Sequence, residues 1–167
     1  MQMANLRDLY GQQLAGLRQA ETNLMQVLPT LQKAAFSPEL AKTLQSQAQQ
    51  AREHVQRLDG ILNGSPAPEN RAAPSITSLV QGCMDLGRQE DAPPDVRDAA
   101  LIAAVQRVEH DQIVGYGCAR TWAQVLGDND ARSILQKCLT EEKNCDAELS
   151  RIAEKTNQRA AAALAVV

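Results

Sequence analysis

Four long stretches of the chain repeat apolar residues at alternating steps of three and four, which is the spacing of one face of an α-helix. The clearest stripe consists of Tyr10, Leu14, Leu17, Glu21, Leu24, Leu28 and Leu31. Comparable stripes run through residues 40–61, 102–116 and 135–152. Ala, Leu and Gln dominate the composition and favour helices, and runs of β-branched residues are scarce. The sequence therefore predicts an all-α domain.

Capping and turn signals divide the four stripes into helices. We expect helices at residues 5–35, 38–63, 95–127 and 130–155, and a short one at 75–88. Ser37 and Pro38 form an N-cap and a first turn, and Gly127 ends a helix before Asp128 or Asp130 caps the next one. Four long antiparallel helices in two hairpins, with one crossover connection that carries a short fifth helix, form a ferritin-like four-helix bundle.

The length of 167 residues suits a single domain with a substantial core. We expect the bundle to span residues 1–157. The remaining residues, 158–167, are expected to form a frayed or disordered tail, because NQRAAAALAVV has no periodic polar face. Pro29 falls inside the first stripe and is expected to kink that helix or to interrupt its hydrogen bonds.

Charge and hydropathy exclude several classes of partner. The net charge of −3 and the pI of about 5.4 argue against general nucleic-acid binding. The N-terminal MQMANLRDLY lacks the apolar region of a signal peptide, and no apolar run is long enough to span a membrane. We therefore expect a cytoplasmic protein without membrane contact. Its four cysteines include no CxxC pair and are expected to act as small buried hydrophobic residues.

Each stripe is interrupted near its middle by polar residues. These are Glu21 in the first, Gln47, Gln50 and His54 in the second, Glu109 and Gln112 in the third, and Glu142 and Asp146 in the fourth. In an antiparallel bundle the middles of the helices lie at one level, so these side chains are expected to converge. Carboxylates that converge in a dry core repel one another and need protons or cations to neutralise them.

Two divalent cations would neutralise these residues, as in di-iron and di-manganese bundles, where carboxylates and Glu-x-x-His motifs bind the metals. Carboxylate and imidazole ligands suit Fe and Mn. The candidate ligands are Glu21, Gln50, His54, Glu109, Glu142 and Asp146. The set is incomplete. The second helix offers the neutral Gln50 where a carboxylate is expected, and the fourth offers Glu142 and Asp146 without a histidine.

A metal-free arrangement is the alternative. Glu109 and Glu142 could pair with Arg52 or Arg107 in a buried polar network that sets the register of the helices. The position of Arg52 discriminates between the two hypotheses, because its guanidinium between the carboxylates would exclude a metal. Tyr116 is expected to pack and hydrogen-bond near this level of the bundle. In a metal site it would support the ligands or take part in redox chemistry.

Several segments resemble a known family: AETNLMQVLPTLQKAAFSPEL, EHVQRLDGIL, DVRDAALIAAVQRVEHDQIVGYGCAR and LTEEKNCDAEL. Together they resemble the YciE/YciF-type ferritin-like stress proteins over nearly the whole chain, from about Leu6 to Ile152. The segment that begins VRDAALIAA is the most specific part. The resemblance implies a bundle of the ferritin and rubrerythrin superfamily, commonly a dimer, with a di-metal centre and a role in oxidative or osmotic stress.

The resemblance also assigns metal ligands position by position. The family's glutamate in the first helix falls on Glu21, and that of its VEH motif falls on Glu109. Its EExxxD pattern in the last helix falls on Glu142 and Asp146. These four residues are the ligands that the resemblance implies.

The second helix departs from the family pattern, because HLEETxxQ reads QAQQAREH in this chain. Gln47, Gln50 and His54 stand where the family has histidine, glutamate and glutamine. Thr77 stands where the family has a further glutamate in the connecting helix. The departure predicts a weakened or lost di-metal centre.

Two functions follow from these observations. The first is a ferritin-like stress protein with an Fe or Mn carboxylate centre that oxidises Fe(II) or consumes peroxide. The second is a non-catalytic bundle that holds no metal and acts by dimerising or by binding a partner. A homodimer is expected because Val114, Trp122 and the AAALAVV tail offer apolar surface that needs cover. The sequence leaves open whether the protein is an enzyme.

Overall fold

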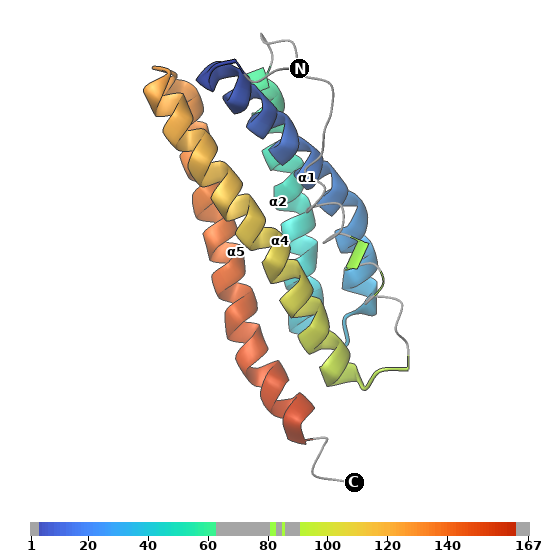
Figure 1. Cartoon of the computed structure of the whole chain (residues 1–167). Coiled ribbons are helices and arrows are strands. Elements are labelled where there is room, and N and C mark those ends of the chain that lie inside the picture. Colours follow the sequence, from blue (N-terminus) through green and yellow to red (C-terminus); the bar gives the residue numbers. More distant parts are fainter. Residues whose placement is uncertain (1–3, 63–80, 83–84, 86–90, 163–167) are drawn as a thin grey trace.

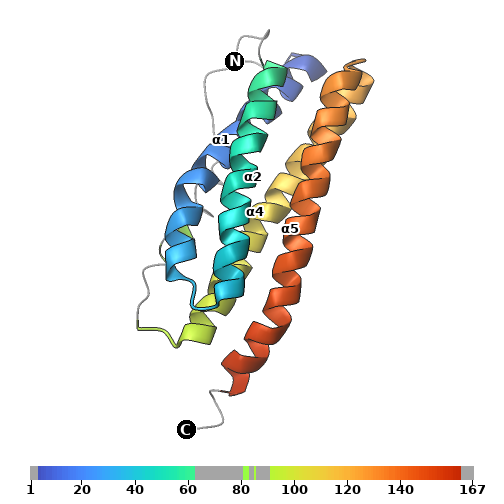
Figure 2. The same cartoon turned by 180° about the vertical axis from the view of Figure 1, so that it is seen from behind.

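The computed structural model describes residues 4–62, 81–82, 85 and 91–162 of the 167-residue chain. Its long helices are α1 (Leu6–Ala34), α2 (Pro38–Leu62), α4 (Pro94–Val125) and α5 (Asn129–Ala162). Figures 1 and 2 show two antiparallel hairpins, α1–α2 and α4–α5, side by side in an elongated bundle. The predicted all-α bundle of two hairpins is confirmed. The short helix expected at 75–88 falls almost wholly outside the described residues.

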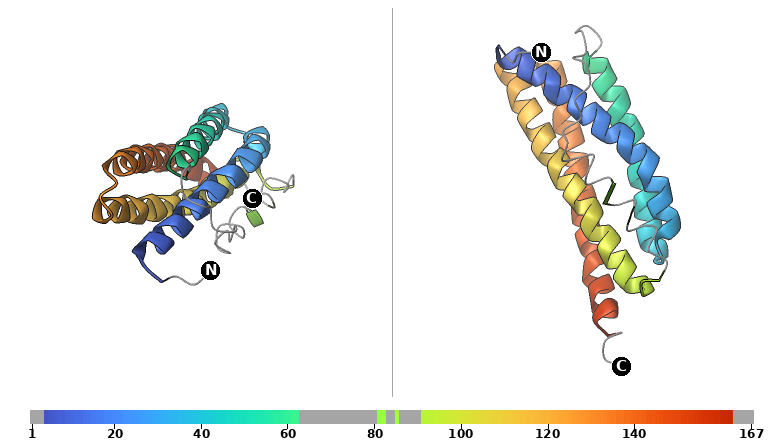
Figure 3. Two further views of the ribbon diagram at one scale, coloured as in Figure 1. Left: turned by 90° about the horizontal axis from the view of Figure 1, so that it is seen from above. Right: turned by 45° about the vertical axis from the view of Figure 1, so that its right-hand side comes forward.

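The two hairpins pack against each other through two interfaces. α1 contacts α4 and α2 contacts α5, in addition to the contacts within each hairpin. Each helix therefore has a neighbour on two sides, as the views in Figure 3 show. In the part of the chain that the structure describes, no helix combines the length and apolar character needed to cross a membrane.

The turn between α4 and α5 follows the predicted signals, and Pro29 can be compared with its predicted effect. α1 continues past Pro29, so the proline does not end it. Gly127 joins α4 to α5 with a φ of +81°, a left-handed conformation that favours glycine. The Asp128 carboxylate accepts a hydrogen bond from the Ala131 N–H at 3.0 Å, which makes Asp128, and not Asp130, the cap of α5.

The C-terminal helix is longer than predicted. α5 reaches Ala162, whereas the sequence pattern predicts an end at residue 155. Thr156 is fully buried, and Arg159 donates to the carboxylate of Asp95 at the start of α4 at 2.7 Å. The alanines that follow favour a helix. Residues 158–162 of the expected tail therefore continue α5, and residues 163–167 lie outside the described part.

Two apolar clusters fill the bundle. One packs around Leu28 and Leu149, toward the turn between α1 and α2. The other packs around Leu14 and Leu135, toward the turn between α4 and α5. Between them lie the buried residues that we call the polar layer: Glu21, Gln47, His54, Glu109, Gln112 and Glu142. Because apolar side chains enclose this layer, its polar groups need partners inside the bundle.

A residue of α4 holds the turn between α1 and α2. Asp98 is fully buried, and its two carboxylate oxygens accept hydrogen bonds from the backbone N–H groups of Phe36 and Ser37, each at 2.8 Å. One side chain thus satisfies two backbone donors at the junction of the helices. This contact ties the first hairpin to the second.

The backbone of α4 lies close to α1 at Gly115. A Cβ atom there would lie 2.8 Å from Leu17 Cδ2 and 2.8 Å from Gln13 Nε2, whereas a Cβ atom at Gly117 would meet nothing within 4 Å. We expect Gly117→Ala to raise the free energy of unfolding by about 1 kcal/mol, because alanine favours helices. Gly115→Ala should lower it by about 1 kcal/mol through overpacking. Chemical denaturation measures both, and equal effects would contradict the close packing at Gly115.

Candidate metal centre

Three helices place ionisable side chains at one point in the polar layer. Nδ1 of His54, on α2, lies 2.9 Å from Oε1 of Glu21 on α1 and 2.8 Å from Oε1 of Glu142 on α5. α4 contributes Tyr116, whose hydroxyl donates to Oε1 of Glu21 at 2.6 Å. All four side chains are buried. The structure thus brings together three of the residues that the sequence singles out, and their ligand atoms lie close enough to share one metal ion.

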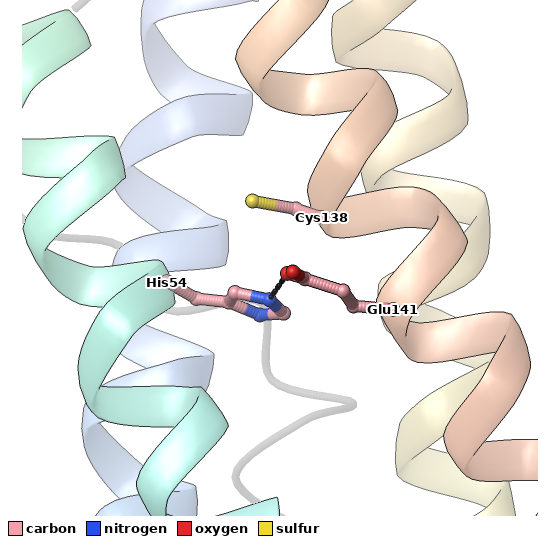
Figure 4. Close-up of side chains that lie close together, drawn as sticks. All are labelled: His54, Cys138 and Glu141. Carbon is pink, nitrogen blue, oxygen red and sulfur yellow. Dashed lines mark hydrogen bonds and ion pairs between the residues drawn. The ribbon is translucent and has the colours of Figure 1, made fainter.

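The other ring nitrogen of His54 faces a different carboxylate. Nε2 lies 2.8 Å from Oε2 of Glu141, and Figure 4 shows Glu141 and Cys138 reaching from α5 toward the ring. Arg57 donates to the same Glu141 oxygen, and its Nη1 lies 3.7 Å from Cys138 Sγ. Because Arg57 already supplies a positive charge here, a second cation beside Nε2 would be repelled.

An imidazole nitrogen carries at most one hydrogen, which limits the arrangements open to His54. When Nε2 carries a hydrogen toward Glu141, Nδ1 faces the carboxylates of Glu21 and Glu142. A bare nitrogen lone pair would be repelled by these two oxygens. A proton, held by Nδ1 or by one of the carboxyl groups, or a metal ion must therefore lie between Nδ1 and the carboxylate oxygens.

Burial and neighbouring charges shift the pKa values of the polar layer. Burial alone would lower the pKa of His54, but hydrogen bonds with Cys138, Glu142 and Glu21 outweigh it and raise that pKa. Burial raises the pKa of Glu21 to about 7, against the opposing hydrogen bond with His54. Burial and the charge of Glu142 raise the pKa of Glu109 well above its usual range. Without metal, the layer therefore retains protons that a cation would displace.

A small internal cavity of about 10 Å³ lies beside the cluster, with room for one water-sized particle. Its polar wall consists of Glu21, Gln47, Gln50, Glu109, Glu142 and Cys145. Oε2 of Glu109, both amide atoms of Gln47 and Nε2 of Gln50 are buried, with no hydrogen-bond partner among the described residues. Buried polar atoms of this kind indicate a place for a bound water or ion.

The structure separates one predicted ligand from the others. Glu109 and Gln50 line the cavity beside the cluster, but Asp146 does not. Its Oδ1 accepts a hydrogen bond from Gln106 at 3.0 Å and lies 3.5 Å from His110 Nε2. Asp146 follows Glu142 by about one helical turn and so starts from nearly the same face of α5, but its side chain turns toward Gln106 and His110 of α4.

The predicted arginine partners do not enter the polar layer, so this part of the metal-free alternative is wrong. Arg52 and Arg107 are both exposed, and Arg52 donates outside the core to Gln49 at 3.2 Å. Two residues turn a helix by about 200°, so Arg52 lies opposite His54 on α2. The side chain that contacts the carboxylates of Glu21 and Glu142 is His54.

Sequence reasoning missed the outer half of the cluster. The helical spacing gives no role to Glu141 or Arg57, and it predicts only a small buried hydrophobic residue at Cys138. A signal was present, because Arg57 follows His54 by three residues and Glu141 follows Cys138 by three, so each pair shares a helix face. Long side chains at such flanking positions reach a neighbouring helix even when they lie outside the apolar stripe.

Comparison with known proteins finds relatives over nearly the whole chain. Residues 5–162 match the model of the family described as a domain of unknown function, DUF892. Protein YciF of Escherichia coli strain K12 is 28% identical over 155 residues, which cover 92% of this chain and 93% of YciF. The predicted resemblance to YciF-type proteins is therefore confirmed.

Two solved structures share the fold. The crystal structure of YciF, described as a stress protein of E. coli, matches with a TM-score of 0.86 at 28% identity and covers 93% of this chain and 99% of that one. YcfI from Rhodopseudomonas palustris matches with a TM-score of 0.82 at 29% identity and covers 89% and 94% of the two chains. Together these matches identify the ferritin-like bundle.

Proposed function

This chain belongs to the family described as a domain of unknown function, DUF892, and on that basis we propose that it is a ferritin-like stress protein that binds a transition-metal ion. The role in stress rests on the relative YciF, which is described as a stress protein. The metal site rests on this chain's own residues. Glu21, His54 and Glu142 would hold one Fe or Mn ion, since carboxylates and imidazole suit both metals.

The orientation of His54 carries the proposal. Its Nδ1 lies within 2.9 Å of two buried carboxylate oxygens while its Nε2 faces Glu141. Ligand atoms bound about 2.1 Å from one ion at neighbouring octahedral positions lie about 3 Å apart. Metal-binding histidines commonly donate the other ring N–H to a carboxylate, which fixes the ring. Glu141 fills this role, and Arg57 holds Glu141 in place.

The donor set fits one ion better than the two that the resemblance implies. Glu21, Glu109 and Glu142 carry at most three negative charges, while Gln47 and Gln50 add none where the family pattern has a histidine and a glutamate. Two divalent cations would leave a net positive charge in the core, which is costly. One divalent cation balances Glu21 and Glu142 and leaves a proton on Glu109.

The residues around the site position its ligands and hold a proton, as redox chemistry at a bound metal requires. A bound iron or manganese ion supplies one-electron chemistry toward oxygen or peroxide. Tyr116 fixes the Glu21 carboxylate by donating to its Oε1. Glu109 holds a proton on the cavity wall, and Gln50 presents an unpaired amide nitrogen close by. The two apolar clusters exclude bulk water. We therefore propose oxidation of Fe(II) or consumption of peroxide as the reaction.

Metal content tests the proposal. Protein purified without an affinity tag or chelator is loaded anaerobically with Fe(II) or Mn(II), dialysed, and analysed by elemental mass spectrometry. We expect about one ion per chain, and about a hundredfold weaker binding in Glu142→Ala. The matched control is Asp146→Asn, because the resemblance makes Asp146 a ligand whereas the structure places it outside the cluster. The proposal fails if the wild type binds no metal, or if both variants lose binding equally.

A second candidate function needs no metal. It is favoured by the ion pairs of His54, since an imidazolium together with a proton on Glu21 neutralises the two carboxylates without metal. The protein would then act by dimerising or by binding a partner. α4 leaves Val114 and Val125 65% and 68% exposed, which gives such contacts an apolar face. Sedimentation of the metal-free and the metal-loaded protein measures whether dimers form and whether they depend on metal.

A further inference from the structure

A pocket of about 230 Å³ opens on the outer side of the interface between α2 and α5. Hydrogen-bonding side chains of Thr43, Ser46 and Asn144 line it. The carboxylates of Glu141 and Glu148 also lie on its wall. Every residue on its wall thus carries a polar group, although the pocket sits on the seam between two helices whose buried faces are largely apolar.

The pocket and the internal cavity share one wall. Gln47, Gln50 and Cys145 line both of them. This wall consists of side chains, two of which are joined by a hydrogen bond of 3.4 Å from Cys145 Sγ to Gln50 Oε1. A thiol is a weak donor. Breaking this contact takes the rotation of a side chain and no change in either helix.

Unsatisfied polar atoms mark the same wall. Gln47 is only 4% exposed, yet neither atom of its amide has a hydrogen-bond partner among the described residues. Nε2 of Gln50 is also buried without a partner. A buried amide costs free energy unless something bonds to it. These amide atoms are therefore available to bond to a water molecule or an ion at this wall.

We propose that this pocket is the entrance through which a hydrated divalent cation reaches the cluster of Glu21, His54 and Glu142, and that Gln50 and Cys145 form its gate. This inference rests on the proposed function, because it names the route to that site. Glu141 connects the two ends of the route, since it lines the pocket while its Oε2 contacts His54.

The chemistry of the lining suits a cation in transit. Hydroxyl, amide and carboxylate oxygens can replace the waters of a hydrated ion one at a time. Glu141 is paired with Arg57, and Glu148 with Arg151. These arginines reduce the negative charge that the ion meets. An ion must be bound well enough to enter and weakly enough to leave, so paired carboxylates suit a passage better than free ones.

The rate of metal uptake tests the inference. Ser46→Trp would fill the outer pocket without touching the cluster, and Ser150→Trp is the matched control on the α4–α5 side of α5, where Ser150 contacts Gln106. We expect Ser46→Trp to slow the uptake of Mn(II) at least about tenfold at unchanged final occupancy. Ser150→Trp should load at the wild-type rate. Equal rates in all three proteins would overturn the inference.

A second readout does not depend on metal. Iodoacetamide alkylates accessible thiols, and peptide mass spectrometry follows Cys145 separately from the other cysteines. We expect Ser46→Trp to protect Cys145 about tenfold relative to Ser150→Trp. Unchanged alkylation would show that the reagent reaches Cys145 by another path and would overturn the route. A wild-type protein that binds no metal at equilibrium would instead overturn the proposed function, even if Cys145 is protected.

Discussion

Replacing His54 by leucine is expected to lower the free energy of unfolding of the metal-free protein by about 3–5 kcal/mol. The imidazole is fully buried, and its two nitrogens contact Glu21, Glu142 and Glu141. Without it, Glu21 and Glu142 would have to remain charged in the core or take up protons, and either choice is costly. Urea denaturation in the presence of a chelator, followed by circular dichroism, measures the loss.

The control for this experiment lies on the same helix. Arg52→Ala removes a charged side chain that is exposed and contacts Gln49, so its effect should stay within about 0.5 kcal/mol. The double variant His54→Leu/Glu142→Leu should lose less than the sum of the two single variants, because the histidine and the carboxylate depend on each other. Additive losses would mean that His54 does not neutralise Glu142.

The apolar stripes predicted the fold well because helix packing obeys a simple period. Residues such as Leu28, Leu58 and Leu149 fall on the stripes and are buried. The end of α5 was missed because it depends on a contact distant in sequence, between Arg159 and Asp95. No local pattern in the alanine-rich segment predicts that contact. The connection between α2 and α4 falls largely outside the described residues and adds nothing to this comparison.

The candidate site was predictable only in part. The period placed Glu21, His54 and Glu142 on the buried faces, and they are buried. The helical period does not predict which of these side chains form hydrogen bonds with each other. His54 meets Glu141 through a side chain that starts beside the stripe, and Asp146 turns away although it follows Glu142 by one helical turn. Periodicity resolves a face of a helix, whereas hydrogen bonds depend on rotamers and on the neighbouring helix.

Replacing Asp98 by alanine is expected to lower the free energy of unfolding by about 3 kcal/mol. The carboxylate accepts two backbone hydrogen bonds at 2.8 Å, from Phe36 and Ser37, in a fully buried position. Alanine would leave both donors unpaired at the junction of α1 and α2. Since Asp98 belongs to α4, the change also weakens the contact between the hairpins. Thermal and urea denaturation measure the effect.

Asp95→Ala supplies the matched control on the same helix. Asp95 also pairs with another helix, through Arg159 of α5, but both side chains are partly exposed and such pairs contribute at most about 1 kcal/mol. Asp98→Asn separates geometry from charge, because its amide keeps one acceptor and turns a donor toward the second N–H. We expect the free energy of unfolding of Asp98→Asn to lie between those of the wild type and Asp98→Ala. If Asp98→Ala and Asp95→Ala were equally mild, the turn between α1 and α2 would hold without Asp98, and this contact would not help to join the hairpins.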